Sequence, residues 1–338
     1  MRKLISLVVL AMLATMIAAC GPEAATPVPA TPTTAAVVEA TATTAMAEAT
    51  PTEVMAEATA TTATVAEVTP TVAGTGVVTD VSLSAIKERG RLVVGVKYDV
   101  PTFGFLNPAT NVVEGFDVEM GKAVAQRIFG NADAIEFKEA ISRNRIPYLN
   151  DGVVDVIFST MTANEERAGQ IDFSDCYYVA GQSLLVPVDS DITNIGDLSG
   201  KTVGTVQGST SEKNIRDKSP QATVELFGTY SEAVQAMQSG RVQAVTTDDI
   251  ILYGFARQNP DRFKVVGGQF TQEPYAAGVK KGNTELLNEV NGAIRDLKQS
   301  GKWSELFKQW VSATDNPPVP PQDWQEVYKQ PTATVPTP

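Results

Sequence analysis

The sequence predicts an α/β protein built from two lobes, and three observations support this. Short apolar strands alternate with amphipathic helices from about Val81 onward, which is typical of sheets covered by helices on both faces. About nine strands are expected, which is more than one small sheet needs. The chain has 338 residues, of which 43% are hydrophobic, so it is long enough to bury two cores.

The expected strands are runs of apolar, often β-branched residues that end at small or polar residues. They cover 91–97, 134–140, 153–159, 182–187, 201–206, 222–227, 243–248, 262–267 and 275–281. Because the connections between them are short and include helices, we expect the strands of each sheet to run parallel.

Three of the helices between these strands have recognisable ends. They are expected over 118–129, 231–239 and 250–258. Asp117 is interpreted as the N-terminal cap of the first helix, and Gly130 follows its last residue. Asp248 or Asp249 is interpreted as the start of the third helix.

The first residues, 1–19, are expected to form a secretory signal peptide. Met1-Arg2-Lys3 is basic, and the apolar stretch that follows is short for a membrane span. Its end, Ile17-Ala18-Ala19-Cys20, resembles a bacterial lipoprotein box, which implies that Cys20 is lipidated and becomes the mature N-terminus. An ordinary signal peptide with a chance cysteine is the alternative. We expect an extracytoplasmic protein, anchored to the outer face of the cell membrane or periplasmic.

The segment 20–79 is expected to be a disordered tether between the lipid and the folded part. After Cys20 it consists almost entirely of Ala, Thr, Pro, Val and Glu. The run EATATTAMAEATPT from Glu39 recurs imperfectly as EATATTATVAEVTPT from Glu57. A segment of this composition, without aromatic residues, cannot bury enough surface to offset its ordering entropy.

The composition excludes several kinds of chemistry. Histidine is absent, which removes Ser-His-Asp and Cys-His catalysis and most zinc sites. Cys176 is the only cysteine besides Cys20, and we interpret it as a small buried packing residue. The net charge is −12, half of it from six glutamates of the tether, and the folded part has no basic stripe. We therefore expect no cofactor, no metal and no nucleic-acid partner.

Polar and charged side chains gather at the carboxyl ends of the expected strands, where open α/β sheets bind their ligands. They comprise cations, hydroxyl groups and one carboxylate. In chain order they are Lys97, Ser142, Arg143, Arg145, Thr160, Thr162, Arg167, Ser209, Thr210 and Asp248. A zwitterion with an additional negative charge would satisfy this set.

Four stretches resemble the extracellular solute-binding proteins that serve amino-acid ABC importers. They are GVKYDVPTFGFLNPATNVVEGFDVEM, NRIPYLNDGVVDVIFSTMTANEERAGQIDFSDCYY, DLSGKTVGTVQGSTSE and GRVQAVTTDDIILYGF, and the resemblance covers about 80–325. It implies a two-lobe periplasmic-binding-protein fold of type II, with a discontinuous first lobe and two hinge strands. The implied parts are 81–184 plus 277–316 for lobe 1, 185–276 for lobe 2, and 317–338 for a C-terminal tail packed against the protein.

The resemblance also implies a role for each residue that matches the family's motifs. Arg167 is identified as the group that binds the α-carboxylate of the ligand through a bidentate pair. The remaining groups are Thr162, Ser209 and Thr210 for the carboxylate, and Asp248 and Thr160 for the α-ammonium.

Within the family, the nearest likeness is to the glutamate- and aspartate-binding members. Lys97, Ser142 and Arg145 match the groups that hold the side-chain carboxylate in those members. Tyr275 matches a hinge-side tyrosine near the ligand and is a possible additional contact, whereas Arg143 is interpreted as solvated. Some acidic-ligand members also use a histidine, which this chain lacks, so the choice between glutamate and aspartate stays open.

Each assignment has a simpler alternative in which the residue binds no ligand. Arg167 would pair with Glu165 or Asp172 on a surface turn, as most arginines do. Asp248 would only cap a helix, and Lys97 would be an ordinary lysine at the end of a strand.

Together these expectations describe a monomeric, lipid-anchored receptor that captures glutamate or aspartate and delivers it to an ABC permease. Three alternatives stay open. The first is a broader receptor for polar amino acids such as glutamine or asparagine. The second is an enzyme, because a few dehydratases share this fold, although no histidine is available for acid–base work. The third is a sensory receptor that passes its closed state to a separate signalling chain.

Overall fold

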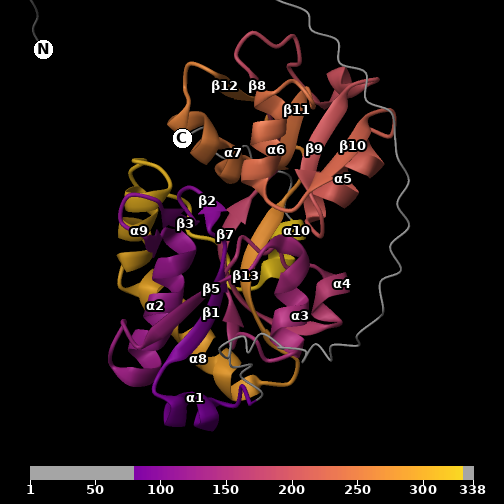
Figure 1. The fold of residues 1–338 in the computed structure, drawn as a ribbon. Helices are drawn as coiled ribbons and strands as arrows, with labels where there is room; N and C mark the ends of the chain where they lie inside the picture. Colours follow the sequence, from indigo (N-terminus) through magenta and orange to yellow (C-terminus); the bar gives the residue numbers. More distant parts are fainter. Residues whose placement is uncertain (1–79, 330–338) are drawn as a thin grey trace, which may run out of the picture. The chain divides into compact units, whose positions relative to one another are not determined.

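The computed structural model describes residues 80–329, which contain two five-stranded sheets with helices packed against them (Figure 1). The strands of the first sheet are, in spatial order, β5 (Ile135–Glu139), β1 (Leu92–Val96), β6 (Val156–Ile157), β13 (Glu273–Lys280) and β7 (Ile171–Ala180). Those of the second are β10 (Thr223–Phe227), β9 (Thr202–Val206), β11 (Ala244–Asp248), β8 (Gln182–Pro187) and β12 (Phe263–Val266). The expected two-sheet α/β architecture is confirmed.

Some expectations concern parts of the chain outside the described residues. They are the signal peptide 1–19, the lipidated Cys20, the tether 20–79 and the last residues of the tail, 330–338. Within 80–329, none of the helices is long and apolar enough to cross a membrane. The same residues contain no group of three His, Cys, Asp or Glu side chains placed to hold a metal ion.

The expectation of wholly parallel sheets is wrong, because both sheets are mixed. In the first sheet β13 runs antiparallel to β6 and β7, and in the second β8 runs antiparallel to β11 and β12. The reason is the path of the chain. It leaves the first sheet along β7, passes Gly181, enters the second sheet along β8 and returns along β13. A strand that enters a sheet from the interface runs opposite to strands whose carboxyl ends point to that interface.

The ten-residue strand β7 is absent from the expected strands, although it forms one edge of the first sheet. Its sequence mixes apolar residues with Asp172, Ser174 and Asp175, so it does not read as a continuous apolar run. A small sheet of β2 (Asp99–Val100), β3 (Gly104–Asn107) and β4 (Val112–Glu114) was also not expected. Conversely, the strand expected over 153–159 is reduced to the two residues of β6.

The helices lie between and around the strands. They are α1 (Leu83–Arg89), α2 (Phe116–Phe129), α3 (Arg145–Asn150), α4 (Glu165–Ala168), α5 (Thr210–Lys218), α6 (Tyr230–Gln238), α7 (Asp249–Gln258), α8 (Thr284–Gln299), α9 (Lys302–Trp310) and α10 (Trp324–Tyr328), with short 3-10 turns η1 (Ser142–Asn144) and η2 (Ile195–Leu198). The three helices expected from their ends are present as α2, α6 and α7.

The interpretation of Asp117 as a helix cap is wrong. Helix α2 begins two residues earlier than expected, at Phe116, after Gly115, whose φ of 132° is accessible to glycine. A Cβ at Gly115 would lie 2.2 Å from the carbonyl oxygen of Phe103, so the close approach also requires glycine. Asp117 instead is buried, and its carboxylate accepts the N–H of Thr160 at 2.8 Å and the hydroxyl of Tyr177 at 2.7 Å. Burial raises the pKa of Asp117 to about 6.

The small sheet also contacts the helices of the second sheet. The Oδ2 atom of Asp99, on β2, accepts the N–H groups of Tyr230 at 2.7 Å and Ser231 at 3.2 Å. These are the first two residues of α6, where backbone N–H groups have no partner within the helix. A side chain next to the first sheet therefore stabilises a helix of the second.

Cys176 is buried in β7, as expected, and burial raises the pKa of its thiol to about 12. The described part of the C-terminal tail packs against the same strand. The N–H of Cys176 donates to the carbonyl of Gln322 at 2.7 Å, and Lys298 Nζ donates to the carbonyl of Pro320 at 3.0 Å. These bonds join residues 320 and 322 to β7 and α8.

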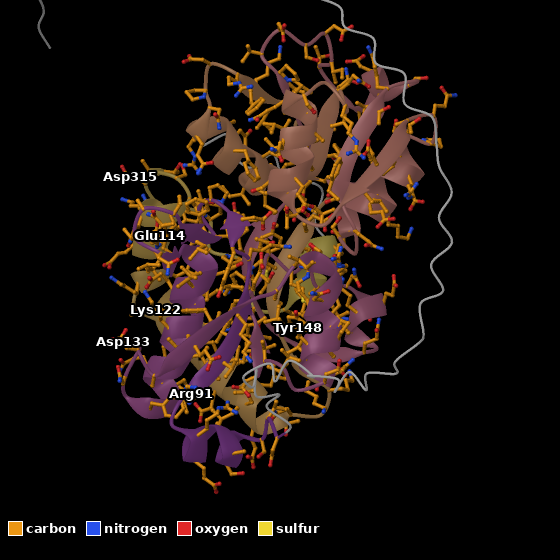
Figure 2. All side chains as sticks on the ribbon, in the orientation of Figure 1. Arg91, Glu114, Lys122, Asp133, Tyr148 and Asp315 are labelled. Carbon is orange, nitrogen blue, oxygen red and sulfur yellow. The ribbon has the colours of Figure 1, made fainter. Side chains whose placement is uncertain are left out.

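The charged side chains fall into two groups. Figure 2 shows Arg91 and Asp133 at the periphery of the first sheet, and both are exposed. Other charged residues are buried, and several of these are the residues expected at the strand ends. The buried ones among the expected site residues are Lys97, Arg145, Arg167 and Asp248.

Candidate functional site

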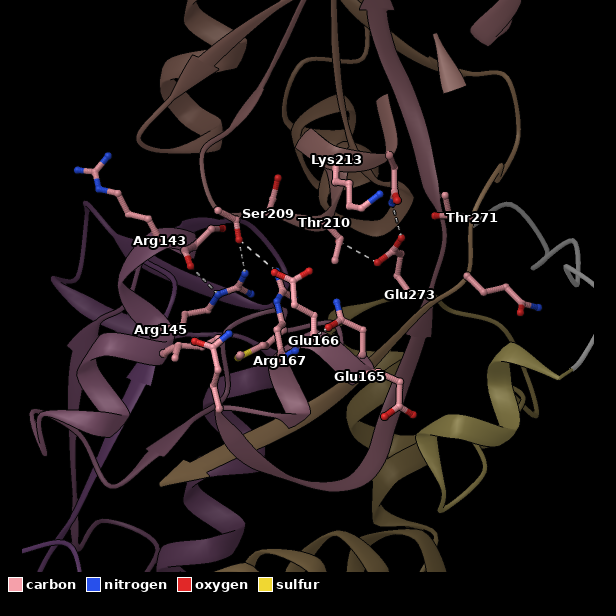
Figure 3. Close-up of a pocket in the computed structure, with 18 of the residues that line it drawn as sticks. Arg143, Arg145, Glu165, Glu166, Arg167, Ser209, Thr210, Lys213, Thr271 and Glu273 are labelled. Carbon is pink, nitrogen blue, oxygen red and sulfur yellow. Dashed lines mark hydrogen bonds between the residues drawn. The ribbon is translucent and has the colours of Figure 1, made fainter. Parts of the chain in front are cut away.

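The expected site residues meet between the two sheets. Figure 3 shows Arg145 and Arg167, from α3 and α4 beside the first sheet, facing Ser209 and Thr210 at the start of α5 beside the second sheet. These residues line a cavity of about 900 Å³, together with Ser142.

Five further expected residues do not line that cavity. They are Lys97, Thr160, Thr162, Asp248 and Tyr275. All five are buried. Hydrogen bonds connect Lys97, Thr160 and Thr162 to groups around the cavity, whereas Asp248 and Tyr275 bond to each other. The expected residues are therefore gathered between the sheets, and the deeper ones are closed off from solvent.

Arg167 is held by the turn that carries it. The side chain of Asn164 accepts the N–H of Arg167 at 2.9 Å, which caps the four-residue helix α4. The guanidinium donates from Nη1 to the carbonyl of Thr162 at 2.7 Å and from Nη2 to the carbonyl of Gly208 at 3.1 Å. The latter bond crosses from one sheet to the other.

The pairing of Arg167 with a surface carboxylate is not observed. Asp172 forms an ion pair with Lys281 at 2.8 Å, and no described carboxylate lies within ion-pair distance of Arg167. Arg167 is 9% exposed, and burial lowers its pKa. A buried guanidinium without a carboxylate partner is a ready site for an anionic group.

Asp248 ends β11 and precedes α7, but its side chain makes no capping hydrogen bond. Asp248 thus occupies the N-cap position of α7, but its carboxylate is not used to cap the helix. Its Oδ2 atom accepts the hydroxyl of Tyr275 at 2.5 Å, whereas its Oδ1 atom is buried without a hydrogen-bond partner. Burial, followed by the nearby charge of Glu273, raises the pKa of Asp248 well above its ordinary value. The free oxygen suits a cationic donor.

Lys97 follows the last residue of β1 and is 1% exposed. Its ammonium donates to Ser142 Oγ at 2.8 Å and lies 5.4 Å from the centre of the Tyr230 ring, a cation–π contact. Burial, followed by the charge of Arg145, lowers the pKa of Lys97 to about 7. An ammonium has three N–H donors, so two remain for a further acceptor.

Arg145 has a different set of partners. It donates from Nε to the carbonyl of Ser142 at 3.1 Å and from Nη1 to the carbonyls of Ser159 and Thr160, both at 3.0 Å. A longer bond of 3.4 Å joins Nη2 to the carbonyl of Gly208. Four of the five N–H groups of the guanidinium are thus used by main-chain oxygens.

The turn at Thr160 explains why these bonds matter. Thr160 has a φ of 44°, a left-handed conformation that is strained for a β-branched residue. Arg145 binds its carbonyl, and Asp117 accepts its N–H. Arg145 therefore maintains the shape of the turn that leads to Thr162.

The hydroxyl groups of the second sheet's helix α5 have local partners. Ser209 caps α5, donates to the carbonyl of Val206 at 2.6 Å and accepts the N–H of Glu212 at 3.3 Å. Thr210 Oγ1 donates to Glu273 at 2.9 Å and lies 3.4 Å from Thr162 Oγ1, across the interface of the sheets.

Two residues of the site were missed in the sequence. Tyr230 starts α6, and its ring supports Lys97. Glu273 is a buried carboxylate that starts β13 and binds Thr210 and Asn214. A glutamate at the start of an apolar strand was a usable signal. The sequence contained no such signal for Tyr230, because this residue begins a helix and does not end a strand.

The chain matches known proteins over this whole region. A family model described as bacterial extracellular solute-binding proteins, family 3, matches residues 92–313. The chain is 44% identical over 231 residues to the ABC transporter glutamine-binding protein GlnH of Bacillus subtilis, covering 68% of this chain and 84% of that protein. It is 48% identical over 217 residues to the glutamine-binding protein of Geobacillus stearothermophilus, covering 64% and 80%.

Other proteins similar to the chain are named for other amino acids. The glutamate-binding protein GluB of Corynebacterium glutamicum is 34% identical over 256 residues, covering 72% of this chain and 86% of that protein. A solved structure described as an ancestral arginine-binding protein bound to glutamine has a TM-score of 0.62 and 39% identity, covering 65% of this chain and 97% of that chain.

Proposed function

The chain belongs to family 3 of the bacterial extracellular solute-binding proteins, and from this membership we propose that it captures an amino acid and delivers it to an ABC permease. The buried Arg167 cation and the unpartnered oxygen of Asp248 support this proposal. They are complementary to the α-carboxylate and the α-ammonium that all amino acids share. The relatives are binding proteins and not enzymes, so the dehydratase alternative is not supported.

We propose L-glutamine as the preferred ligand, with glutamate second, in place of the acidic ligand expected from the sequence. That expectation counted Lys97 and Arg145 as two cations for a side-chain carboxylate. The donors of Arg145 are mostly bonded to main-chain carbonyls, which leaves Lys97 to meet the ligand's side chain. This observation carries the choice of ligand, and the glutamine-binding relatives agree with it.

A single lysine with a lowered pKa is sufficient to bind the side-chain amide of a ligand. The ammonium of Lys97 already lies in a buried site with a hydroxyl and an aromatic ring as partners, and no carboxylate forms an ion pair with it among residues 80–329. An amide oxygen would accept one of its spare N–H groups without a new charge being buried. Burial of a side-chain carboxylate costs more desolvation free energy than burial of an amide. One lysine that is partly neutral offsets this cost only in part.

The test is isothermal calorimetry with L-glutamine and L-glutamate from about pH 6.5 to about pH 8.5. We expect glutamine to bind more tightly at about pH 7.5. Burial lowers the pKa of Lys97 to about 7, so the free receptor loses the Lys97 proton as the pH rises above 7. Binding of glutamate favours the charged lysine and must then be accompanied by uptake of a proton. The affinity for glutamate relative to glutamine should therefore fall by up to about tenfold per pH unit above 7.

The ratio of the two affinities removes effects common to both ligands, including any protonation of Asp248. A Lys97→Met variant should make this ratio independent of pH. Tighter binding of glutamate than glutamine throughout would restore the acidic-ligand expectation. A ratio that does not change with pH in the wild type would show that Lys97 does not contact the ligand's side chain.

We further propose that Cys20 is lipidated and that 20–79 tethers the folded part to the outer face of the membrane. The lipoprotein box and the composition of the tether support this. A Cys20→Ser variant should no longer partition into detergent after processing, whereas the wild type should. Equal partitioning of the two would contradict lipidation at Cys20.

We also propose that the two sheets belong to lobes that close on the ligand, 81–184 plus 277–316 and 185–276, with 317–338 as a tail. The path of the chain supports this, because it crosses between the sheets in extended strands. The receptor is proposed to act as a monomer.

A further inference from the structure

The turn that carries Arg167 is too short to be stable by itself. Helix α4 has only four residues, and a helix that short is not stable by itself in water. The orientation of the Arg167 guanidinium must therefore depend on contacts that fix the turn from outside.

The peptide groups of Ala163 provide this fixation. Ala163 is fully buried and lies between Thr162 and Asn164, the residue that caps α4. Its N–H donates to the carbonyl of Pro274 on β13 at 2.8 Å. Its carbonyl accepts the hydroxyl of Tyr328 at 2.8 Å.

Tyr328 is the last residue of α10, so the C-terminal tail supplies half of this support. A second contact from the same helix is the bond from Gln325 Nε2 to Glu165 Oε1 at 2.6 Å, on the first residue of α4. Figure 3 shows the yellow ribbon of this tail helix beside the labelled Glu165. Tyr328 also lines the cavity next to Arg167.

Helix α10 is itself docked firmly. The Trp324 ring packs edge-on against Phe173 of β7, with centroids 6.0 Å apart, and Val327 is buried. The segment before the helix is bonded to β7 and to Lys298 through Gln322 and Pro320. The tail thus connects the strand that leads to the second sheet with the turn that carries Arg167.

We infer that α10 is part of the ligand site and that Tyr328 is a positioning residue for Arg167. The inference rests on the proposed function, since Arg167 is the group proposed to bind the α-carboxylate. Removing the Tyr328 hydroxyl leaves the buried carbonyl of Ala163 without its partner and lets the α4 turn shift. Binding should then weaken for every ligand that presents an α-carboxylate.

The experiment compares the full chain with its Tyr328→Phe variant, which keeps the ring. Calorimetry with L-glutamine should show a dissociation constant at least about fivefold higher in the variant. Tyr328→Phe should cause no further loss when it is added to Arg167→Ala, because both changes act on the same contact. Tyr98→Phe is the matched control: its hydroxyl donates to the carbonyl of Phe137 at 3.0 Å, and affinity should not change.

A second measurement needs no ligand. Amide hydrogen exchange over 162–169 should be faster in Tyr328→Phe than in the wild type, while the melting temperature changes little. Unchanged exchange in this segment, or a dissociation constant within twofold of the wild type, would overturn the inference. If no amino acid binds the wild type, the proposed function fails, and the exchange result still decides whether Tyr328 supports the turn.

Discussion

Replacement of Arg167 by alanine should weaken the binding of every amino acid alike, by ~2–5 kcal/mol or about 30- to 4,000-fold. The α-carboxylate would remain buried in the closed site without its charged partner, which is the costly half of a broken pair. Because the α-carboxylate is common to all amino acids, the preference for glutamine over glutamate should not change.

Arg143→Ala is the matched control for this result. Arg143 lines the same cavity but is exposed, and Figure 3 shows it pointing away from Arg145 and Arg167. Its removal should change the dissociation constant less than twofold. A change of less than about threefold for Arg167→Ala would remove Arg167 from the site.

The second large effect is expected for Asp248→Asn, which keeps the shape of the side chain but removes its charge. The Oδ1 atom of Asp248 has no hydrogen-bond partner, so the proposed α-ammonium is its natural donor. Loss of the charge should weaken binding by about 2 kcal/mol or more, again for all amino acids.

The pH dependence has a definite sign. Burial raises the pKa of Asp248 well above its ordinary value, and an ammonium bound beside the carboxylate would lower it again. Binding should therefore release a proton below the raised pKa, and affinity should increase as the pH rises toward it. This dependence should disappear in Asp248→Asn. Asp249→Asn is the neighbouring control, because Asp249 bonds to Gln269 and Gly181 and is not assigned to the ligand.

The sequence predicted which charged residues lie between the sheets better than it predicted the direction of the strands. Lys97, Arg167 and Asp248 are buried between the sheets because the carboxyl ends of several strands face one interface, so residues at those ends lie close together whatever the details of the fold. The direction of β8 and β13 was predicted wrongly. Strand direction depends on which end of the sheet the chain enters, and a local hydrophobic pattern contains no record of that.

The role of Arg145 shows a second limit. In the sequence, an arginine near the end of a strand is interpreted as a cation that is available to bind a ligand. In the structure its partners are carbonyls of Ser159, Thr160 and Gly208, of which Gly208 lies on the other sheet's loop. Backbone carbonyls are present at every residue, so no sequence pattern identifies which of them an arginine will bind. The proposal of glutamine in place of an acidic ligand rests on this difference.

The contacts between the two sheets have a consequence for transport. Arg145 and Arg167 both bind the carbonyl of Gly208, and Asp99 binds the first N–H groups of α6. Only protein groups take part. If the lobes close as proposed, these bonds lower the free energy of the closed form whether or not a solute is present. Stronger bonds raise the apparent affinity, but they also raise the number of empty closed receptors that compete with filled ones for the permease. Their strength therefore sets a compromise between scavenging at low solute concentration and the rate of delivery.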